Sequence, residues 1–93
     1  MVLEILSQDF AVCEIDKNQP VDLSNDFIFL GKTDEELSLV CPAEHLPATV
    51  QECEKSWRAF RVKGPLEFAL IGILSKISTI LANNGISIFA IST

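Results

Sequence analysis

The feature that most constrains the fold is an alternating segment that leads through Gly64-Pro65 into a long helical repeat. Residues 57–63 follow the period-two pattern of a strand. Pro65 suits the first turn of a helix, and Asn84-Gly85 supplies a left-handed stop. The apolar residues between these breaks recur at helical spacing and define a stripe that we expect to be buried: Leu66, Leu70, Ile73, Leu74, Ile77, Ile80 and Leu81.

A second strand is predicted after this helix, because residues 86–91 read Ile-Ser-Ile-Phe-Ala-Ile. A strand, a helical crossover and a strand form a unit whose two strands belong to one sheet, with the helix covering one face. Burial of Leu74 in that packing predicts a cost of roughly 2–5 kcal/mol for Leu74→Ala. The pattern of residues 86–91 favours burial on both faces, so we expect its edge to pair with another chain.

The first half of the chain predicts several short strands. Residues 2–6 and 10–15 are rich in branched apolar side chains and indicate two strands or one bent strand. Residues 27–30 predict a further strand, which Gly31 ends.

A turn and a fourth strand follow in this half. Residues 33–36, Thr-Asp-Glu-Glu, have the spacing of a capping box and predict a turn or a single helical turn. Residues 37–41 alternate like a strand, and Pro42 ends it. The segment 45–53 carries polar residues and a proline and predicts a linker.

Charge is distributed unevenly along the chain. The 7 Lys and Arg against 13 Asp and Glu give a formal net charge of −6, which argues against nucleic-acid and anionic-membrane binding. Residues 1–56 hold 12 acidic and 3 basic side chains, a net −9, and residues 57–93 hold 1 and 4, a net +3. Opposite charges on the two halves favour packing of the chain on itself or on a second copy. The hydrophobic content of 48% excludes a disordered chain.

The cysteines and the histidine indicate neither a metal site nor a redox pair. Cys13, Cys41 and Cys53 are 28 and 12 residues apart without a CxxC pair, so we expect reduced, partly buried thiols in a cytoplasmic protein. His45 lies beside Glu44 with no further ligand or nucleophile nearby in the sequence, which favours an ordinary loop. No cofactor is implied.

Targeting signals are not indicated. Residues 1–12 contain Glu4 and Asp9, lack a basic start and carry no small-residue cleavage site, unlike a signal peptide. The longest apolar stretch, 68–81, is interrupted by Lys76 and is too short for a membrane span.

One backbone position has a chemical argument in its favour, although the sequence contains no familiar catalytic motif. Gly64, Pro65 and Leu66 lie where the predicted strand ends and the helix starts, and the free backbone N–H groups at a helix start, together with the helix dipole, favour a small anion such as an amino-acid carboxylate. Gly64 lets such a ligand approach the main chain closely. An ordinary strand–helix turn is the alternative interpretation of the same residues.

Three segments carry a resemblance to a known family. They are Trp-Arg-Ala-Phe-Arg-Val-Lys-Gly-Pro-Leu-Glu-Phe at 57–68, Gly-Ile-Ser-Ile-Phe-Ala-Ile-Ser-Thr at 85–93 and Thr-Asp-Glu-Glu-Leu-Ser-Leu-Val-Cys-Pro at 33–42. With them the chain resembles the stand-alone ACT-domain proteins of the tandem kind, which are similar to the ACT pairs of animal cytosolic arginine sensors and the regulatory ends of aspartate kinases.

The resemblance implies an α+β, ferredoxin-like ACT fold of βαββαβ order that binds a small ligand, commonly an amino acid, at an interface between two ACT units. It divides the chain into a strand-rich, N-terminal ACT-like half at 1–55 and a partial second ACT unit at 56–93. Family members continue past the Ile-Ser-Thr segment, so we expect this chain to be a fragment or to take a strand from another chain. The ligand-binding residues that the resemblance implies are Gly64, Pro65, Leu66, Ala90, Ile91, Ser92 and Thr93.

Two functions of different classes are expected from these observations. The first is a non-enzymatic regulatory module that senses an amino acid. The alternative is a dimerisation or protein-interaction module that has lost the ligand, and a regulatory remnant of a biosynthetic enzyme is a weaker third interpretation. We expect a homodimer or higher homo-oligomer, built by side-by-side strand pairing at residues 86–91, without nucleic-acid or membrane partners.

Overall fold

The computed structural model describes residues 2–50, 52–63 and 70–91. The chain forms two compact units. The sheet unit is Leu3–Arg61, and the helix unit is Met1–Val2 together with Val62–Thr93. The secondary structure is of the α+β type, with a four-stranded sheet and one α-helix in the described residues.

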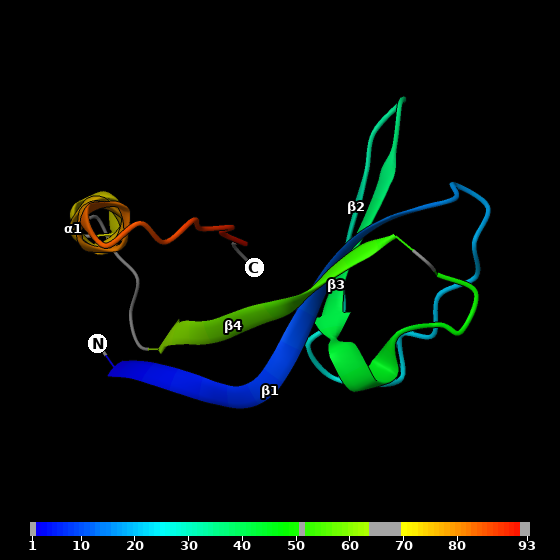
Figure 1. Ribbon diagram of the computed structural model, residues 1–93, viewed down its shortest axis with the longest axis horizontal. Helices are drawn as coiled ribbons and strands as arrows, with labels where there is room; N and C mark the ends of the chain where they lie inside the picture. The colour runs from blue at the N-terminus through cyan, green and yellow to red at the C-terminus, as the bar shows by residue number, and fades with distance from the viewer. Residues whose placement is uncertain (1, 51, 64–69, 92–93) are drawn as a thin grey trace. The chain divides into compact units, whose positions relative to one another are not determined.

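The strands are β1 (Val2–Ile15), β2 (Phe29–Lys32), β3 (Leu37–Pro42) and β4 (Cys53–Lys63), in the sheet order β2-β3-β1-β4. A short 3₁₀ helix, η1 (Ala43–His45), follows β3. β1 is continuous and bends midway, as Figure 1 shows. Of the two alternatives predicted for residues 2–6 and 10–15, two strands or one bent strand, the structure therefore has the second.

A tight turn joins β2 to β3. The backbone N–H of Thr33 donates to the carbonyl of Glu36 at 2.9 Å. The Thr33 hydroxyl oxygen accepts hydrogen bonds from the N–H groups of Glu35 at 3.2 Å and Glu36 at 3.1 Å. This is the turn that the Thr-Asp-Glu-Glu spacing predicts, and it allows β2 and β3 to pair antiparallel, with Lys32 opposite Leu37.

The predicted bounds of the strand before this turn were wrong. It was expected at residues 27–30 with Gly31 ending it, but β2 contains Gly31, which pairs with Ser38. Phe27 has a φ of +62°, in the left-handed region, which interrupts an extended chain before β2 begins. Its ring packs edge-on against Phe10 at a centroid distance of 6.3 Å, and the Arg61 guanidinium lies 5.4 Å from the Phe27 ring centre.

The core of the sheet unit comes from one face of β1 and β3. Alternate residues of a strand share a face, and directly paired residues of antiparallel strands lie on the same face. Cys13 pairs with Leu39 and Ile15 pairs with Leu37, so the two period-two patterns meet on one side. The buried cluster consists of Ala11, Cys13, Ile15, Leu37, Leu39 and Cys41.

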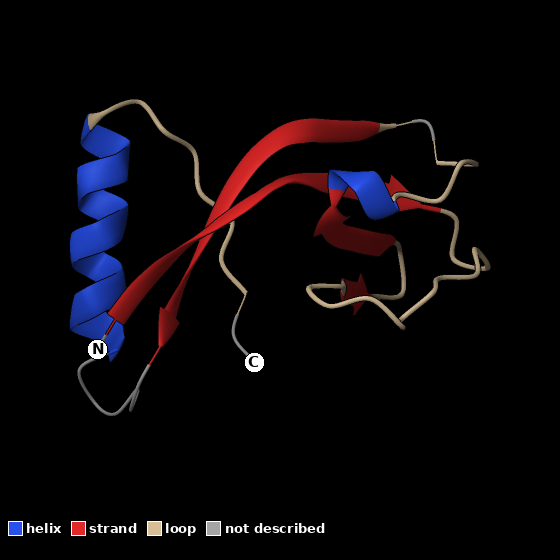
Figure 2. Ribbon diagram, turned by 90° about the horizontal axis from the view of Figure 1, so that it is seen from below, coloured by secondary structure: helices blue, strands red, loops and turns tan. Residues whose placement is uncertain are grey.

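β4 pairs with β1 on the other side of β1 from β3, and Figures 1 and 2 show β1 and β4 side by side. The contacts give the direction of pairing. An Arg61 guanidinium nitrogen lies 2.7 Å from a Glu4 carboxylate oxygen, and Arg58 lies 3.8 Å from Asp9. The residue numbers of the β4 partners thus decrease as those of β1 increase, which makes the pair antiparallel. Exposed ion pairs of this kind contribute at most about 1 kcal/mol each, so they set the register more than they stabilise it.

A disulfide between Cys13 and Cys53 joins the same two strands. The expectation of three reduced cysteines is therefore wrong for this pair, and Cys41 is the free thiol. The Cα atoms are 4.4 Å apart, which is typical of opposed residues without mutual hydrogen bonds in an antiparallel pair. The sequence separation of 40 gave no sign of this, because only the pairing of β1 with β4 brings the residues together.

In the helix unit, α1 (Leu70–Asn83) ends as predicted. Gly85 has a φ of +70°, its N–H donates to the carbonyl of Ala82 at 3.0 Å, and the N–H of Ile86 donates to the carbonyl of Leu81 at 2.9 Å. These two hydrogen bonds form the Schellman motif. The predicted start of the helix at Pro65 and Leu66 lies outside the described residues. None of the described helices has the length and apolar character needed to cross a bilayer.

Two expectations for this unit are wrong. Residues 86–91 have no regular secondary structure, so they do not form the strand that was predicted to share a sheet with residues 57–63, which pair with β1. A strand needs a neighbouring strand for its backbone groups, and the described part of the chain gives this segment no partner strand. The predicted stripe is also incompletely buried, because Leu74 is 45% exposed and Ile80 is 61% exposed. Ile73, Ile77 and Leu81 are half-buried.

A pair of leucine variants tests where the core lies. Leu39 is 1% exposed, so we expect Leu39→Ala to lower the free energy of unfolding by about 2–5 kcal/mol through lost burial and a cavity. Leu74→Ala is the matched control, and the structure predicts a cost of less than about 1 kcal/mol because Leu74 is 45% exposed. Urea unfolding followed by circular dichroism measures both. Equal losses in the two variants would contradict this assignment of the core.

Candidate functional site

Most of the site that the sequence predicts lies outside the described residues. Gly64, Pro65 and Leu66, at the predicted strand–helix loop, are among these, and so are Ser92 and Thr93. The two remaining candidates, Ala90 and Ile91, lie exposed in the segment after α1.

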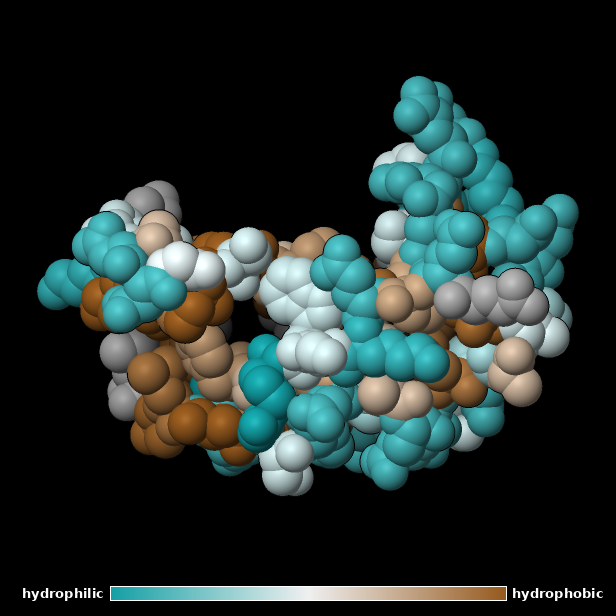
Figure 3. All heavy atoms as spheres, in the orientation of Figure 1, coloured by the Kyte–Doolittle hydropathy of each residue, from teal (hydrophilic) through white to brown (hydrophobic). Residues whose placement is uncertain are grey.

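The helix unit exposes an unusual amount of apolar surface for its size. Large apolar side chains of α1 and the segment after it are between 42 and 61% exposed. Figure 3 shows hydrophobic residues at the surface of this unit, whereas the tip of the β2–β3 hairpin is hydrophilic. Apolar surface of this kind marks an interaction site more often than a free face. We call it the apolar helix-unit surface, and its residues are Leu74, Ile80, Ile86, Ile88, Phe89 and Ile91.

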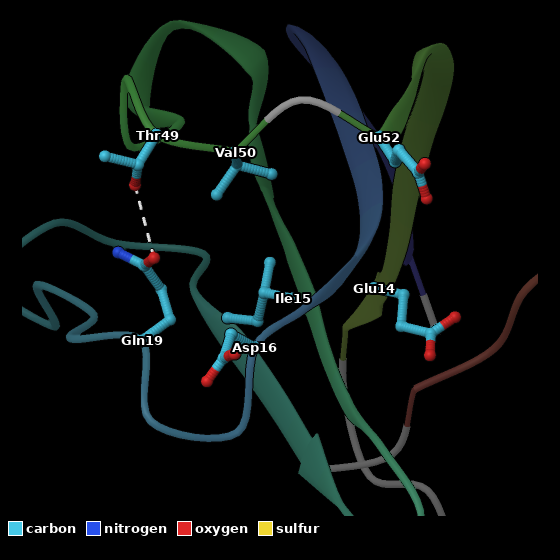
Figure 4. Close-up of a pocket in the computed structure, with 7 residues that line it drawn as sticks. All are labelled: Glu14, Ile15, Asp16, Gln19, Thr49, Val50 and Glu52. Carbon is cyan, nitrogen blue, oxygen red and sulfur yellow. Dashed lines mark hydrogen bonds between the residues drawn. The ribbon is translucent and has the colours of Figure 1, made fainter.

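The sheet unit has a depression of about 280 Å³ between the end of β1 and the segment that leads into β4. Its polar wall includes the side chains of Glu14, Asp16 and Glu52, and we call it the acidic pocket. Figure 4 shows the Thr49 hydroxyl directed at the Gln19 side chain, to which it donates a hydrogen bond of 3.2 Å. Among the described residues, no group of three or more acidic, histidine or cysteine side chains is placed to hold a metal ion. The pocket is therefore a region of negative potential rather than a metal centre.

A second, smaller pocket of about 180 Å³ borders the core cluster. Leu39 and Cys41 of β3 contribute buried side chains to its lining. Burial raises the pKa of the Cys41 thiol, so this thiol stays protonated and unreactive near neutral pH. The other lining residues come from the loop before β2 and from the segment around η1: Pro20, Val21, Asp22, Ile28, His45 and Pro47.

Two polar side chains line this apolar pocket. His45 lies in η1, 3.8 Å from Glu44, and its side chain is 33% exposed. Hydrogen bonds from the hydroxyl and the backbone N–H of Ser24 hold the pKa of the Asp22 carboxyl below its usual range, with a smaller contribution from the charge of His45. His45 was expected to be an ordinary loop residue, and the sequence gave no signal that it shares a pocket with Asp22, 23 positions earlier.

Comparison with known proteins points to one family. An ACT domain family model matches residues 52–93, which include β4, α1 and the segment after it. The X-ray crystal structure of protein Atu0741 from Agobacterium tumefaciens is similar to this structure, with a TM-score of 0.81 and 30% sequence identity. The similarity covers 98% of this chain and 69% of that chain. No curated protein sequence matches the chain.

The lowered pKa of Asp22 predicts a pH response with a defined sign. A carboxyl whose pKa is lower in the folded state stabilises the fold above its unfolded pKa of about 4, and that contribution is lost as the pH falls through the folded pKa. Ser24→Ala removes the largest cause, so we expect the Asp22 pKa to rise part of the way to its ordinary value. Carbon-13 NMR titration of the Asp22 carboxyl measures the change, with Ser78→Ala on α1 as the control. An unchanged Asp22 pKa in Ser24→Ala would show that this hydrogen bond is absent.

Proposed function

This chain belongs to the protein family of Atu0741 from Agobacterium tumefaciens and carries an ACT domain match over residues 52–93, and on that premise we propose that it is a non-enzymatic regulatory module that binds a free amino acid. The ACT match is the observation that carries the proposal, because ACT domains are commonly regulatory domains that bind small ligands. The cytoplasmic location expected from the sequence is part of the proposal. So is the division into an ACT-like half at 1–55 and a partial ACT unit at 56–93.

The ligand site that we propose lies within the matched segment. The backbone N–H groups of Gly64 and Leu66, on either side of Pro65, receive the ligand carboxylate at the predicted start of the helix. Residues 90–93 form the other side, at an interface between ACT units. Two independent lines support this placement: the chemistry of a strand–helix turn that begins with glycine, and the ACT match over the same residues.

The alternative function is a dimerisation or protein-interaction module without a ligand. The apolar helix-unit surface is the observation that favours it, because six large apolar side chains of one small unit are in solvent. Both functions lead to the same partner, a second copy of this chain. Its strand edges and the opposite net charges of residues 1–56 and 57–93 suit association between copies.

A thermal-shift screen of the twenty amino acids tests ligand binding directly. We expect at least one amino acid to raise the melting temperature, and Gly64→Val to abolish that rise because the added side chain occupies the space of the carboxylate. Gly31→Val in β2 is the matched control, since a Cβ at Gly31 meets no atom within 4 Å and should leave ligand binding unchanged. Full ligand response in Gly64→Val would exclude the strand–helix loop as the site, and no response to any amino acid would favour the alternative function.

Sedimentation equilibrium over a hundredfold concentration range tests self-association. We expect a dimer or a larger assembly, and we expect Phe89→Asp to shift it toward the 10.3 kDa monomer by placing a charge in the apolar helix-unit surface. Leu23→Asp, at a 64% exposed position of the sheet unit, is the control and should not change the association. A compact monomer at every concentration would contradict the proposed assembly.

A further inference from the structure

The two ends of the Cys13–Cys53 disulfide differ in their access to solvent. Cys13 lies within the core cluster and is 2% exposed. Cys53 is the first residue of β4, is only half-buried and packs against that cluster from its edge. Thiol–disulfide exchange requires a thiolate to reach one sulfur from outside. The geometry therefore leaves the Cys53 sulfur as the point of attack and the Cys13 sulfur as the leaving group.

The chain next to each cysteine of this bond carries negative charge. Glu14 directly follows Cys13 in the chain, and Glu52 directly precedes Cys53. Both carboxylates line the acidic pocket together with Asp16, and no lysine or arginine is among its lining residues. Figure 4 shows the Glu14 and Glu52 side chains directed away from the Gln19–Thr49 hydrogen bond on the other side of the pocket. Acidic side chains close in the chain to a reactive atom lower the local concentration of anions and raise that of cations.

We propose that the Cys13–Cys53 disulfide is a site of reversible thiol–disulfide exchange, which opens by attack at Cys53 and accepts neutral and cationic small thiols in preference to anionic ones. Disulfides in cytoplasmic proteins are usually transient or redox-sensing. A disulfide that opens and closes reversibly is therefore compatible with the proposed cytoplasmic location. The proposal does not depend on amino-acid binding.

The exchange proceeds in two balanced steps. A small thiolate attacks the Cys53 sulfur, the bond between the two cysteine sulfurs breaks, and the electron pair stays on the Cys13 sulfur, which takes a proton from water. A second small thiolate then attacks the thiol-derived sulfur of the mixed disulfide. This step releases the small-molecule disulfide and leaves Cys53 as a thiolate, which takes up a second proton. Two thiols are oxidised and one protein disulfide is reduced.

Cys41 stays outside this exchange. It belongs to the same buried cluster as Cys13, and the two residues lie on one face of neighbouring strands. Burial raises the pKa of the Cys41 thiol, and only a thiolate attacks a disulfide. The redox change is therefore confined to the link between β1 and β4, the first strand of the ACT-matching segment.

The test uses the full oxidised chain and three thiols of different charge: cysteamine, 2-mercaptoethanol and mercaptoacetate. Each thiol's rate at equal thiolate concentration is divided by its rate with 2-hydroxyethyl disulfide, an uncharged small disulfide, which removes differences in intrinsic nucleophilicity. Trapped free thiols and mixed disulfides are located by peptide mass spectrometry. At low ionic strength we expect this relative rate to be highest for cysteamine and lowest for mercaptoacetate, with a spread of about tenfold. In 1 M salt, where the Debye length is about 3 Å, the spread should fall to about twofold. The first mixed disulfide should form on Cys53.

A charge variant and its control separate the local field from the overall charge. Glu14→Gln with Glu52→Gln removes two exposed carboxylates from the acidic pocket and should reduce the spread to about threefold at low salt. Asp26→Asn with Glu44→Gln removes the same charge from positions that do not line this pocket and should leave the spread unchanged. Equal relative rates for the three thiols, a mixed disulfide on Cys13, or an air-oxidised chain without the Cys13–Cys53 bond would each overturn the proposal.

Discussion

The pairings of β1 with β3 and with β4 are the interactions on which the sheet depends, because β1 lies between these two strands. β3 pairs with β1 only from Phe10 to Ile15, so the part of β1 before Phe10 has β4 as its neighbour. Two contacts link β4 to β1. Arg61 forms an ion pair with Glu4 near the start of β1, and Cys53 forms a disulfide with Cys13 near the end of β1. In the chain-entropy model, a cross-link that closes a loop of this length stabilises a fold by about 4 kcal/mol. The covalent link therefore outweighs the exposed ion pairs of the same strand pair, each of which contributes at most about 1 kcal/mol.

The sequence predicted the features that depend on neighbouring residues. The strand at residues 10–15 follows from period-two alternation, the turn at 33–36 from the Thr33 side chain, and the end of α1 from Gly85, each within a few positions of the chain. Such features need only local geometry. The α+β class also follows from local patterns, because it depends on which elements exist rather than on how they pair.

The features that the sequence did not predict depend on contacts across 40 or more residues. Residues 57–63 were expected to share a sheet with 86–91, but β4 pairs with β1 instead, and the Cys13–Cys53 bond depends on that pairing. The prediction that Leu74 is buried was wrong for the same reason. An apolar stripe indicates that a helix can pack against another element, but it does not indicate which element that is.

The two pockets of the sheet unit were equally inaccessible to sequence analysis. Each is lined by segments that are distant in the chain, so no spacing or motif identifies them. The candidate site that the sequence did indicate, at the strand–helix turn, was inferred from the backbone of one short segment. A motif predicts a site when the backbone alone forms it, whereas a pocket formed by several loops becomes visible only in the folded chain.

The segment 86–91 joins the proposed ligand site to the proposed assembly. Its apolar side chains are exposed, and its residues Ala90 and Ile91 belong to the candidate site. A partner strand that pairs with this segment would fix the backbone of those same residues. A ligand that binds the ordered form more tightly would then favour the assembly, and the assembly would raise the affinity for the ligand by the same factor. In this proposal, amino-acid sensing and self-association would both follow from ordering a single stretch of chain, so they need not be competing explanations of its composition.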